Sequence, residues 1–168
     1  MEHRFVLRSL ESGRVRLYRA ESPEHDHTLE VSPDRDGGWV VPRDGDGWQV
    51  AWQGRTLRFT RSTGGVVATA HKPSLFRERF ELDGAALPLV GGIEVASTRR
   101  WWRRWRLTAP DGTRIGRVER GRWPGRTHEL VLRGTGDPVE LAAVVGWLVA
   151  LVTTDPPSGL RRLGDRGR

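Results

Sequence analysis

Apolar and polar residues alternate along most of this chain in short runs. Alternation with a period of two is the pattern of strands that bury one face and expose the other. The clearest runs lie at residues 14–18, 48–52, 55–59, 65–70, 80–82, 105–107, 115–118 and 129–132. The pattern therefore predicts a protein built mainly of β-strands.

Turn residues separate these runs at short and regular intervals. An aspartate precedes a glycine at Asp36, Asp44, Asp46, Asp83 and Asp111. Tight hairpins need positive φ angles, which glycine adopts freely and aspartate tolerates. We therefore predict ten to twelve antiparallel strands in a meandering barrel or sandwich, with no helix before residue 137.

The C-terminal part has a different pattern, which predicts a helix over residues 138–153. Asp137 is a suitable N-cap, Pro138 suits the first helical position, and Glu140 lies near the positive end of the dipole. Residues 141–152 then contain no charge. A helix that is apolar on every side must be enclosed on every side. A helix over residues 138–153 is ~24 Å long, which is shorter than the roughly 30 Å hydrocarbon core of a membrane. We expect this helix inside a barrel formed by residues 1–154, followed by a flexible basic tail at 155–168.

The hairpin-like segment 105–118 and the helix segment 137–152, at the end of an all-β chain, resemble the tubby C-terminal-like superfamily. That superfamily includes the phospholipid scramblases and the LURP-one-related proteins. The resemblance implies a closed antiparallel barrel of twelve strands around a buried, apolar C-terminal helix. It also implies a link to membrane lipids, although no residue motif of the superfamily for lipid or calcium maps onto this chain.

Composition limits the classes of function. A chain of 168 residues without cysteine fits one domain and excludes disulfides, thiolate metal sites and a cysteine nucleophile. The first ten residues lack the apolar stretch of a signal peptide, so we expect a cytoplasmic protein. The net charge is +7, and Lys72 is the only lysine among 28 basic residues. This arginine-rich balance is typical of GC-rich codon usage, which is the simplest explanation of the high pI.

The positive charge is nevertheless concentrated in one segment. Residues 99–126 contain ten arginines and only two acidic residues. If Trp105 and Leu107 face the core, Arg104 and Arg106 face water on the same side as Trp102. Arg103 would then point inward, unless the strand starts at Arg104 or contains a bulge. The candidate ligand-binding residues are Arg100, Trp102, Arg104, Arg106 and Arg117.

Arginine next to exposed tryptophan suits an anionic membrane surface. We therefore expect a non-enzymatic binding or scaffold domain, peripheral at the membrane, that contacts anionic phospholipid through this hairpin. Nucleic acid, whose bases stack on aromatic rings, ranks below lipid as a partner of the same surface. A solvated arginine-rich edge that prevents strand pairing is another interpretation. The sequence has no nucleophile elbow, P-loop or dinucleotide motif, so we predict no catalytic residue, metal or cofactor, and an enzyme with an unrecognised pocket remains the third alternative.

Overall fold

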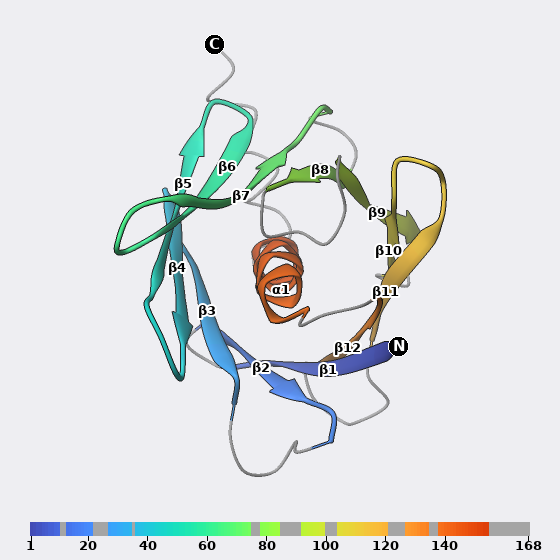
Figure 1. Cartoon of the computed structure of the whole chain (residues 1–168), viewed down its shortest axis with the longest axis horizontal. Helices are drawn as coiled ribbons and strands as arrows, with labels where there is room; N and C mark the ends of the chain where they lie inside the picture. Colours follow the sequence, from blue (N-terminus) through green and yellow to red (C-terminus); the bar gives the residue numbers. More distant parts are fainter. Residues whose placement is uncertain are drawn as a thin grey trace.

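The computed structural model describes residues 1–10, 13–21, 27–34, 36–74, 78–84, 92–99, 104–120, 127–134 and 138–154. Within these residues, twelve antiparallel strands form a closed barrel around a single C-terminal helix (Figure 1). This is the architecture that the sequence predicts. Arg100, Trp102, Arg103, Asp137 and the tail at 155–168 lie outside the described residues.

The strands follow one another around the barrel in chain order. The first six are β1 (Glu2–Ser9), β2 (Val15–Arg19), β3 (Leu29–Asp34), β4 (Gly37–Pro42), β5 (Trp48–Gln53) and β6 (Thr56–Arg61). The second six are β7 (Val66–His71), β8 (Arg79–Asp83), β9 (Ile93–Arg99), β10 (Arg104–Thr108), β11 (Arg114–Arg120) and β12 (Thr127–Arg133). Each strand pairs with its neighbours in sequence, and the first and last strands pair with each other.

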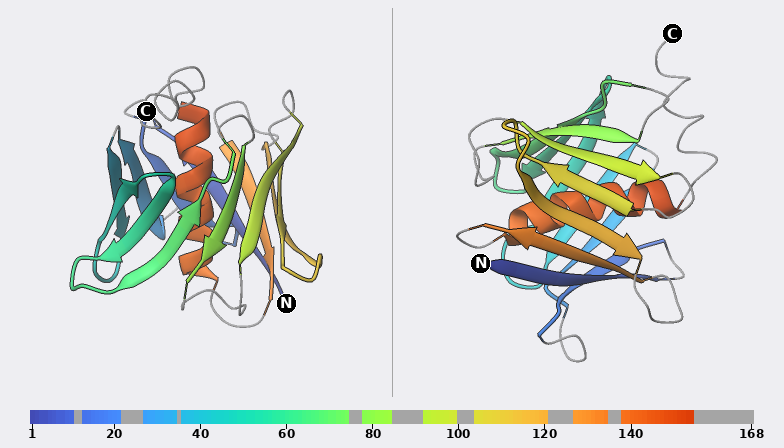
Figure 2. Two further views of the ribbon diagram at one scale, coloured as in Figure 1. Left: turned by 90° about the horizontal axis from the view of Figure 1, so that it is seen from above. Right: turned by 90° about the vertical axis from the view of Figure 1, so that its right-hand side faces the viewer.

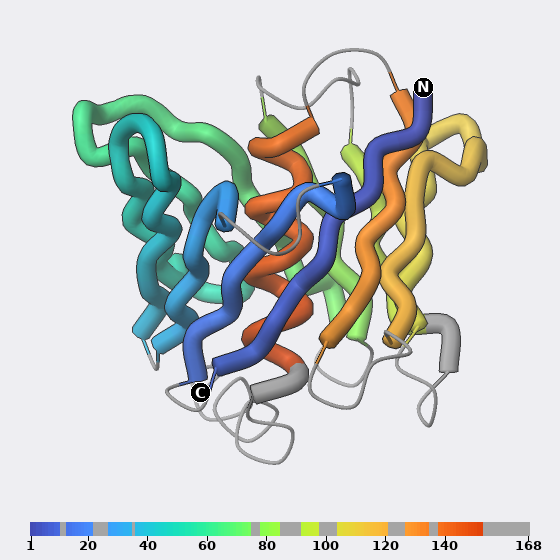
Figure 3. Tube along the Cα trace, turned by 90° about the horizontal axis from the view of Figure 1, so that it is seen from below, coloured from blue at the N-terminus to red at the C-terminus, as the bar shows by residue number. Residues whose placement is uncertain are grey.

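The pairing of β1 with β12 closes the barrel. The register runs from Glu2 opposite Arg133 to Arg8 opposite Thr127, so the two strands pair over nearly their full length. Figure 3 shows β1 between β12 and β2. Closure leaves no free strand edge in the barrel. It also places the first strand, β1, directly beside the last strand, β12.

The helix α1 (Val139–Thr154) runs through the barrel from one open end to the other (Figure 2). Every residue from 141 to 150 is buried. The helix lies closest to β3, with β2, β1 and β12 next. A Cβ atom on Gly146 would lie 3.0 Å from Cδ2 of Leu7, so the glycine allows helix and wall to approach. Trp147 packs edge-on against Phe59, with ring centroids 5.7 Å apart.

The helix begins at Val139, one residue later than predicted, and ends at Thr154, one residue beyond the prediction. The amide of Ala142 donates to the carbonyl of Pro138 at 2.8 Å, so Pro138 precedes the first helical residue. Glu140 forms an ion pair with Arg61, whose guanidinium lies 5.9 Å from the ring centroid of Trp48. These contacts attach the first turn of the helix to β5 and β6. Among the described residues, no helix is both long and apolar enough to cross a membrane.

A charge in the middle of the helix is expected to prevent folding. Leu148 is fully buried, and an aspartate there would lose several kcal/mol of hydration without a partner. We expect Leu148→Asp to yield no soluble protein with a cooperative thermal transition. Val66→Asp is the matched control, because Val66 is exposed on β7 and its replacement costs about 1 kcal/mol or less. A Leu148→Asp variant that melts like the wild type would place the helix outside the core.

Candidate ligand-binding face

A tight turn joins β10 to β11 in the segment where the sequence concentrates arginine. Gly112 has a φ of 85°, and its amide donates to the carbonyl of Ala109 at 2.9 Å. The amide of Thr113 donates to the carboxylate of Asp111 at 2.8 Å, which lowers the pKa of Asp111. The Asp-Gly pair therefore forms the predicted hairpin turn and fixes how the two strands face each other.

The side chains of β10 point in the directions that the sequence predicts. Trp105 and Leu107 are buried in the barrel core, at 2% and 0% exposure, while Arg104 and Arg106 are exposed on the outer surface. The strand begins at Arg104, and the pairing with β9 shifts register between Arg104 and Trp105. Arg103 itself lies outside the described residues, so the prediction about its direction stays a prediction.

Barrel closure extends this basic surface onto strands from the other end of the chain. Arg106 lies opposite Arg117, Arg117 opposite Val131, and Val131 opposite Arg4, so one transverse row crosses four strands. We call the outer surface of β10, β11, β12 and β1 the arginine face. Its outward-pointing basic residues are Arg4, Arg8, Arg104, Arg106, Arg114, Arg117 and Arg133.

Three glutamates pair with part of this face. Glu2 contacts Arg4 at 2.8 Å and Arg133 at 3.5 Å, and Glu129 contacts Arg4 at 3.7 Å. The hydrogen bond from Arg4 holds the pKa of Glu2 below its usual value. Glu119 contacts Arg117 at 3.6 Å. Seven arginines therefore share this face with three glutamates, and an excess of positive charge remains.

On β10 and β11 the excess is located at Arg106 and Arg114. Both side chains are exposed, and neither has an ion-pair partner among the described residues. Arg117, in contrast, is half-buried and paired with Glu119. One hairpin thus presents two arginines without an ion-pair partner among the described residues and one arginine held by a glutamate.

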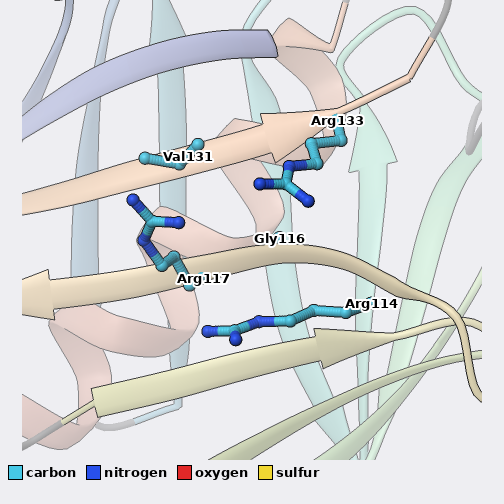
Figure 4. Close-up of a pocket in the computed structure, with 5 residues that line it drawn as sticks. All are labelled: Arg114, Gly116, Arg117, Val131 and Arg133. Atoms are coloured by element: carbon cyan, nitrogen blue, oxygen red, sulfur yellow. The ribbon is translucent and has the colours of Figure 1, made fainter.

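A shallow depression lies in the middle of the arginine face. Arg114, Arg117 and Arg133 surround Gly116 and Val131, and Figure 4 shows Arg117 and Arg133 extending over the seam between β11 and β12. A Cβ atom on Gly116 would lie 2.7 Å from the carbonyl oxygen of Val131, so only glycine allows β12 to lie this close. The volume is about 40 Å³. It can hold a few water molecules or one small anionic group, and not an organic substrate of ordinary size.

Guanidinium groups around a small depression are chemically suited to oxyanions. Arginine presents planar N–H donors that match phosphate and carboxylate oxygens. Among the described residues of the face, no aromatic ring is exposed, because Trp105 is buried. Trp102 and Arg100 lie outside the described residues, so their predicted part in the site stays a prediction.

Sequence reasoning identified Arg104, Arg106 and Arg117 but did not identify Arg4, Arg114 or Arg133 as part of one surface. Arg114 lies just before the predicted run at 115–118, so alternation gave no direction for its side chain. Arg4 and Arg133 join the face only through the pairing of β1 with β12. The predicted closure of the barrel was the one available signal for this pairing, and it gives no register.

The structure gives no support for a metal centre in the part of the chain that it describes. No group of three histidine, aspartate or glutamate side chains there could hold a metal ion. Asp36 lies in the turn between β3 and β4, and Asp44 and Asp46 lie in the loop between β4 and β5. These positions agree with the assignment of the Asp-Gly pairs to turns.

Lys72, the only lysine, is buried directly after β7 at 3% exposure. Its ammonium nitrogen lies 5.7 Å from the ring centroid of Phe80. Burial lowers the pKa of Lys72, and the nearby carboxylate of Glu78 offsets this only in part. The fold therefore destabilises the charged form of Lys72.

Comparison with known proteins leaves the chain without an assigned relative. No protein-family model, no curated protein and no solved structure matches it. The fold and the arginine face are therefore the observations from which function has to be argued.

Lys72 gives the protein a specific dependence on pH. A lysine with a lowered pKa binds fewer protons in the folded state than in the unfolded state, so stability rises as the pH approaches the unfolded pKa of about 10.4. We expect the free energy of unfolding of the wild type to rise between neutral and alkaline pH relative to that of Lys72→Met. The measurement is chemical denaturation of both proteins across this pH range. An unchanged difference between them would mean that Lys72 keeps an ordinary pKa in the fold.

Proposed function

We propose that this protein is a non-enzymatic binding domain that contacts anionic phospholipid at a membrane surface through its arginine face. The observation that carries the proposal is the exposed pair Arg106 and Arg114 beside the depression over Gly116. Membrane surfaces rich in anionic lipid attract basic residues within a Debye length. A lipid phosphate can approach such a surface from outside, without entering a cavity.

The shape of the site favours binding over catalysis. A depression of about 40 Å³ does not enclose a substrate or exclude water from it. The barrel core beside it is filled by inward side chains such as Leu107, Val118 and Leu132. An enzyme whose site includes residues outside the described ranges remains the alternative that the sequence left open.

Lipid fits the described face better than nucleic acid does. Single-stranded nucleic acid is usually held by aromatic rings on which its bases stack, together with a basic groove. The described part of the arginine face offers guanidinium groups without an exposed ring. The lipid partner also agrees with the resemblance to the tubby-like superfamily, and membership of that superfamily is part of the proposal. A cytoplasmic location, peripheral at the membrane, follows from the same proposal.

Vesicle flotation tests the proposal. We expect recovery with vesicles that contain phosphatidylserine and little recovery with phosphatidylcholine alone. Arg106→Ala/Arg114→Ala removes the two arginines without leaving a glutamate unpaired. At about 1 kcal/mol for each arginine near the surface, partitioning onto acidic vesicles should fall about thirtyfold.

Arg55→Ala/Arg58→Ala is the matched control, because both residues are exposed on the opposite half of the barrel, at β5 and β6. This variant should float like the wild type. Equal recovery with neutral and acidic vesicles would exclude the lipid proposal, as would equal loss in both double variants. Binding to a single-stranded oligonucleotide with a steep salt dependence, together with no vesicle binding, would favour the nucleic-acid alternative.

A further inference from the structure

The outer surface of β4 exposes large apolar side chains. Trp39 and Val41 are 53% and 55% exposed, and both point away from the core while Val40 between them is buried. Trp39 lies between Ser32 of β3 and Gln49 of β5, neither of which is charged. Aromatic and aliphatic side chains exposed together on a strand are typical of a contact surface, because they gain free energy when a partner covers them.

Acidic residues lie at both ends of this strand. Asp34 and Asp36 are exposed at the turn before β4, and Asp44 and Asp46 are exposed in the loop after it. Residues 29–53 contain five acidic and two basic side chains. We call the surface of β3, β4 and the two flanking turns the tryptophan face. An apolar centre with a charged rim is the usual anatomy of a protein–protein contact.

The tryptophan face and the arginine face occupy different parts of the barrel wall, with β2 between β3 and β1 on one side and five strands, β5 to β9, between β4 and β10 on the other. Five strands separate β4 from β10 in either direction around the closed sheet. Figure 1 shows β4 and β10 on opposite walls, with α1 between them. The molecule therefore carries an acidic, apolar face and a separate basic face on its outer surface.

We propose that the tryptophan face of one copy of this chain docks against the arginine face of a second copy. The two faces have opposite charge, and tryptophan is the aromatic ring that binds guanidinium groups most strongly. Tryptophan and arginine are also the residues that contribute most to protein contacts. The acidic rim makes the tryptophan face a poor match for an anionic membrane. A second copy is thus the occupant that the charges on this molecule favour.

The contact is head-to-tail, because two different faces meet. Each added copy leaves one face of each kind free, so the association can continue into a row of copies. The proposal goes beyond lipid binding and does not depend on it. Both contacts use Arg106, so vesicles and a second copy compete for the same surface.

Sedimentation velocity of the full chain tests this proposal. We expect the average sedimentation coefficient to rise from micromolar to near-millimolar protein. It should fall between about 0.1 M and about 1 M salt, where the Debye length shrinks from about 10 Å to about 3 Å. A wild-type protein that stays at 18.9 kDa at every concentration in low salt would overturn the proposal.

Variants of each face identify the geometry. Trp39→Ser and Arg106→Glu should each stay monomeric, because each has lost one face. An equimolar mixture should form a heterodimer and nothing larger, since the intact arginine face of Trp39→Ser meets the intact tryptophan face of Arg106→Glu. A mixture that stays monomeric, or a Trp39→Ser variant that assembles like the wild type, would contradict head-to-tail docking.

Two controls match these substitutions. Val66→Ser removes an exposed apolar side chain from β7, and Arg55→Glu reverses an exposed charge in the β5–β6 turn, outside both faces. Both should assemble like the wild type, and all variants should keep the wild-type thermal transition. Trp39→Ser should also keep vesicle binding, so a failure of the lipid proposal and a failure of this one give different results.

Discussion

The rest of the structure depends on one constraint, which is that an apolar helix must be covered on every side. Residues 141–150 of α1 are all buried, so no face of this stretch of the helix is open to water. A single sheet covers one side of a helix, whereas a closed barrel covers all of it. The pairing of β1 with β12 completes this cover. Helix burial and barrel closure are thus two parts of one hydrophobic core.

Because the interior is filled by the helix and inward side chains, the two surfaces to which we assign partners, the arginine face and the tryptophan face, lie on the outside of the barrel. Inward positions alternate with outward positions along each strand, so the outer residues vary without disturbing the core. One part of the wall carries an excess of arginines around Gly116, and another carries Trp39 and Val41 within an acidic rim. The two proposals assign a lipid surface and a second copy to these two parts. Lys72 is the exception, a basic side chain that is buried directly after β7.

The sequence predicted the features that depend on local pattern. Alternation in residues 105–107 predicted that Trp105 points inward and Arg106 outward, and Asp111 with Gly112 predicted the turn. The uncharged segment 141–152 predicted the enclosed helix. Each of these rests on neighbouring residues, whose directions are set by strand and turn geometry. Periodicity therefore predicted which residues of a strand face the core.

What the sequence could not predict depends on register between distant strands or on close backbone contacts. Strand β4 was not recognised from alternation, because Trp39, Val40 and Val41 form an unbroken apolar run after two glycines. A Cβ atom on Gly37 would lie 1.8 Å from the carbonyl oxygen of Val50, so only glycine allows β5 to lie this close to the start of β4. Similarly, the contacts of Glu2 with Arg4 and Arg133 exist only in the observed register of β1 with β12.

Native-state hydrogen exchange tests the shared core most directly. If helix burial and barrel closure are one cooperative unit, the amides of residues 141–150 and those of the β1–β12 pairing exchange only through global unfolding. The account predicts that both sets have the same exchange free energy, equal to the free energy of unfolding from denaturation. Helix amides that exchange at a markedly lower free energy than the strand amides would contradict it, because the helix could then leave a barrel that remains closed.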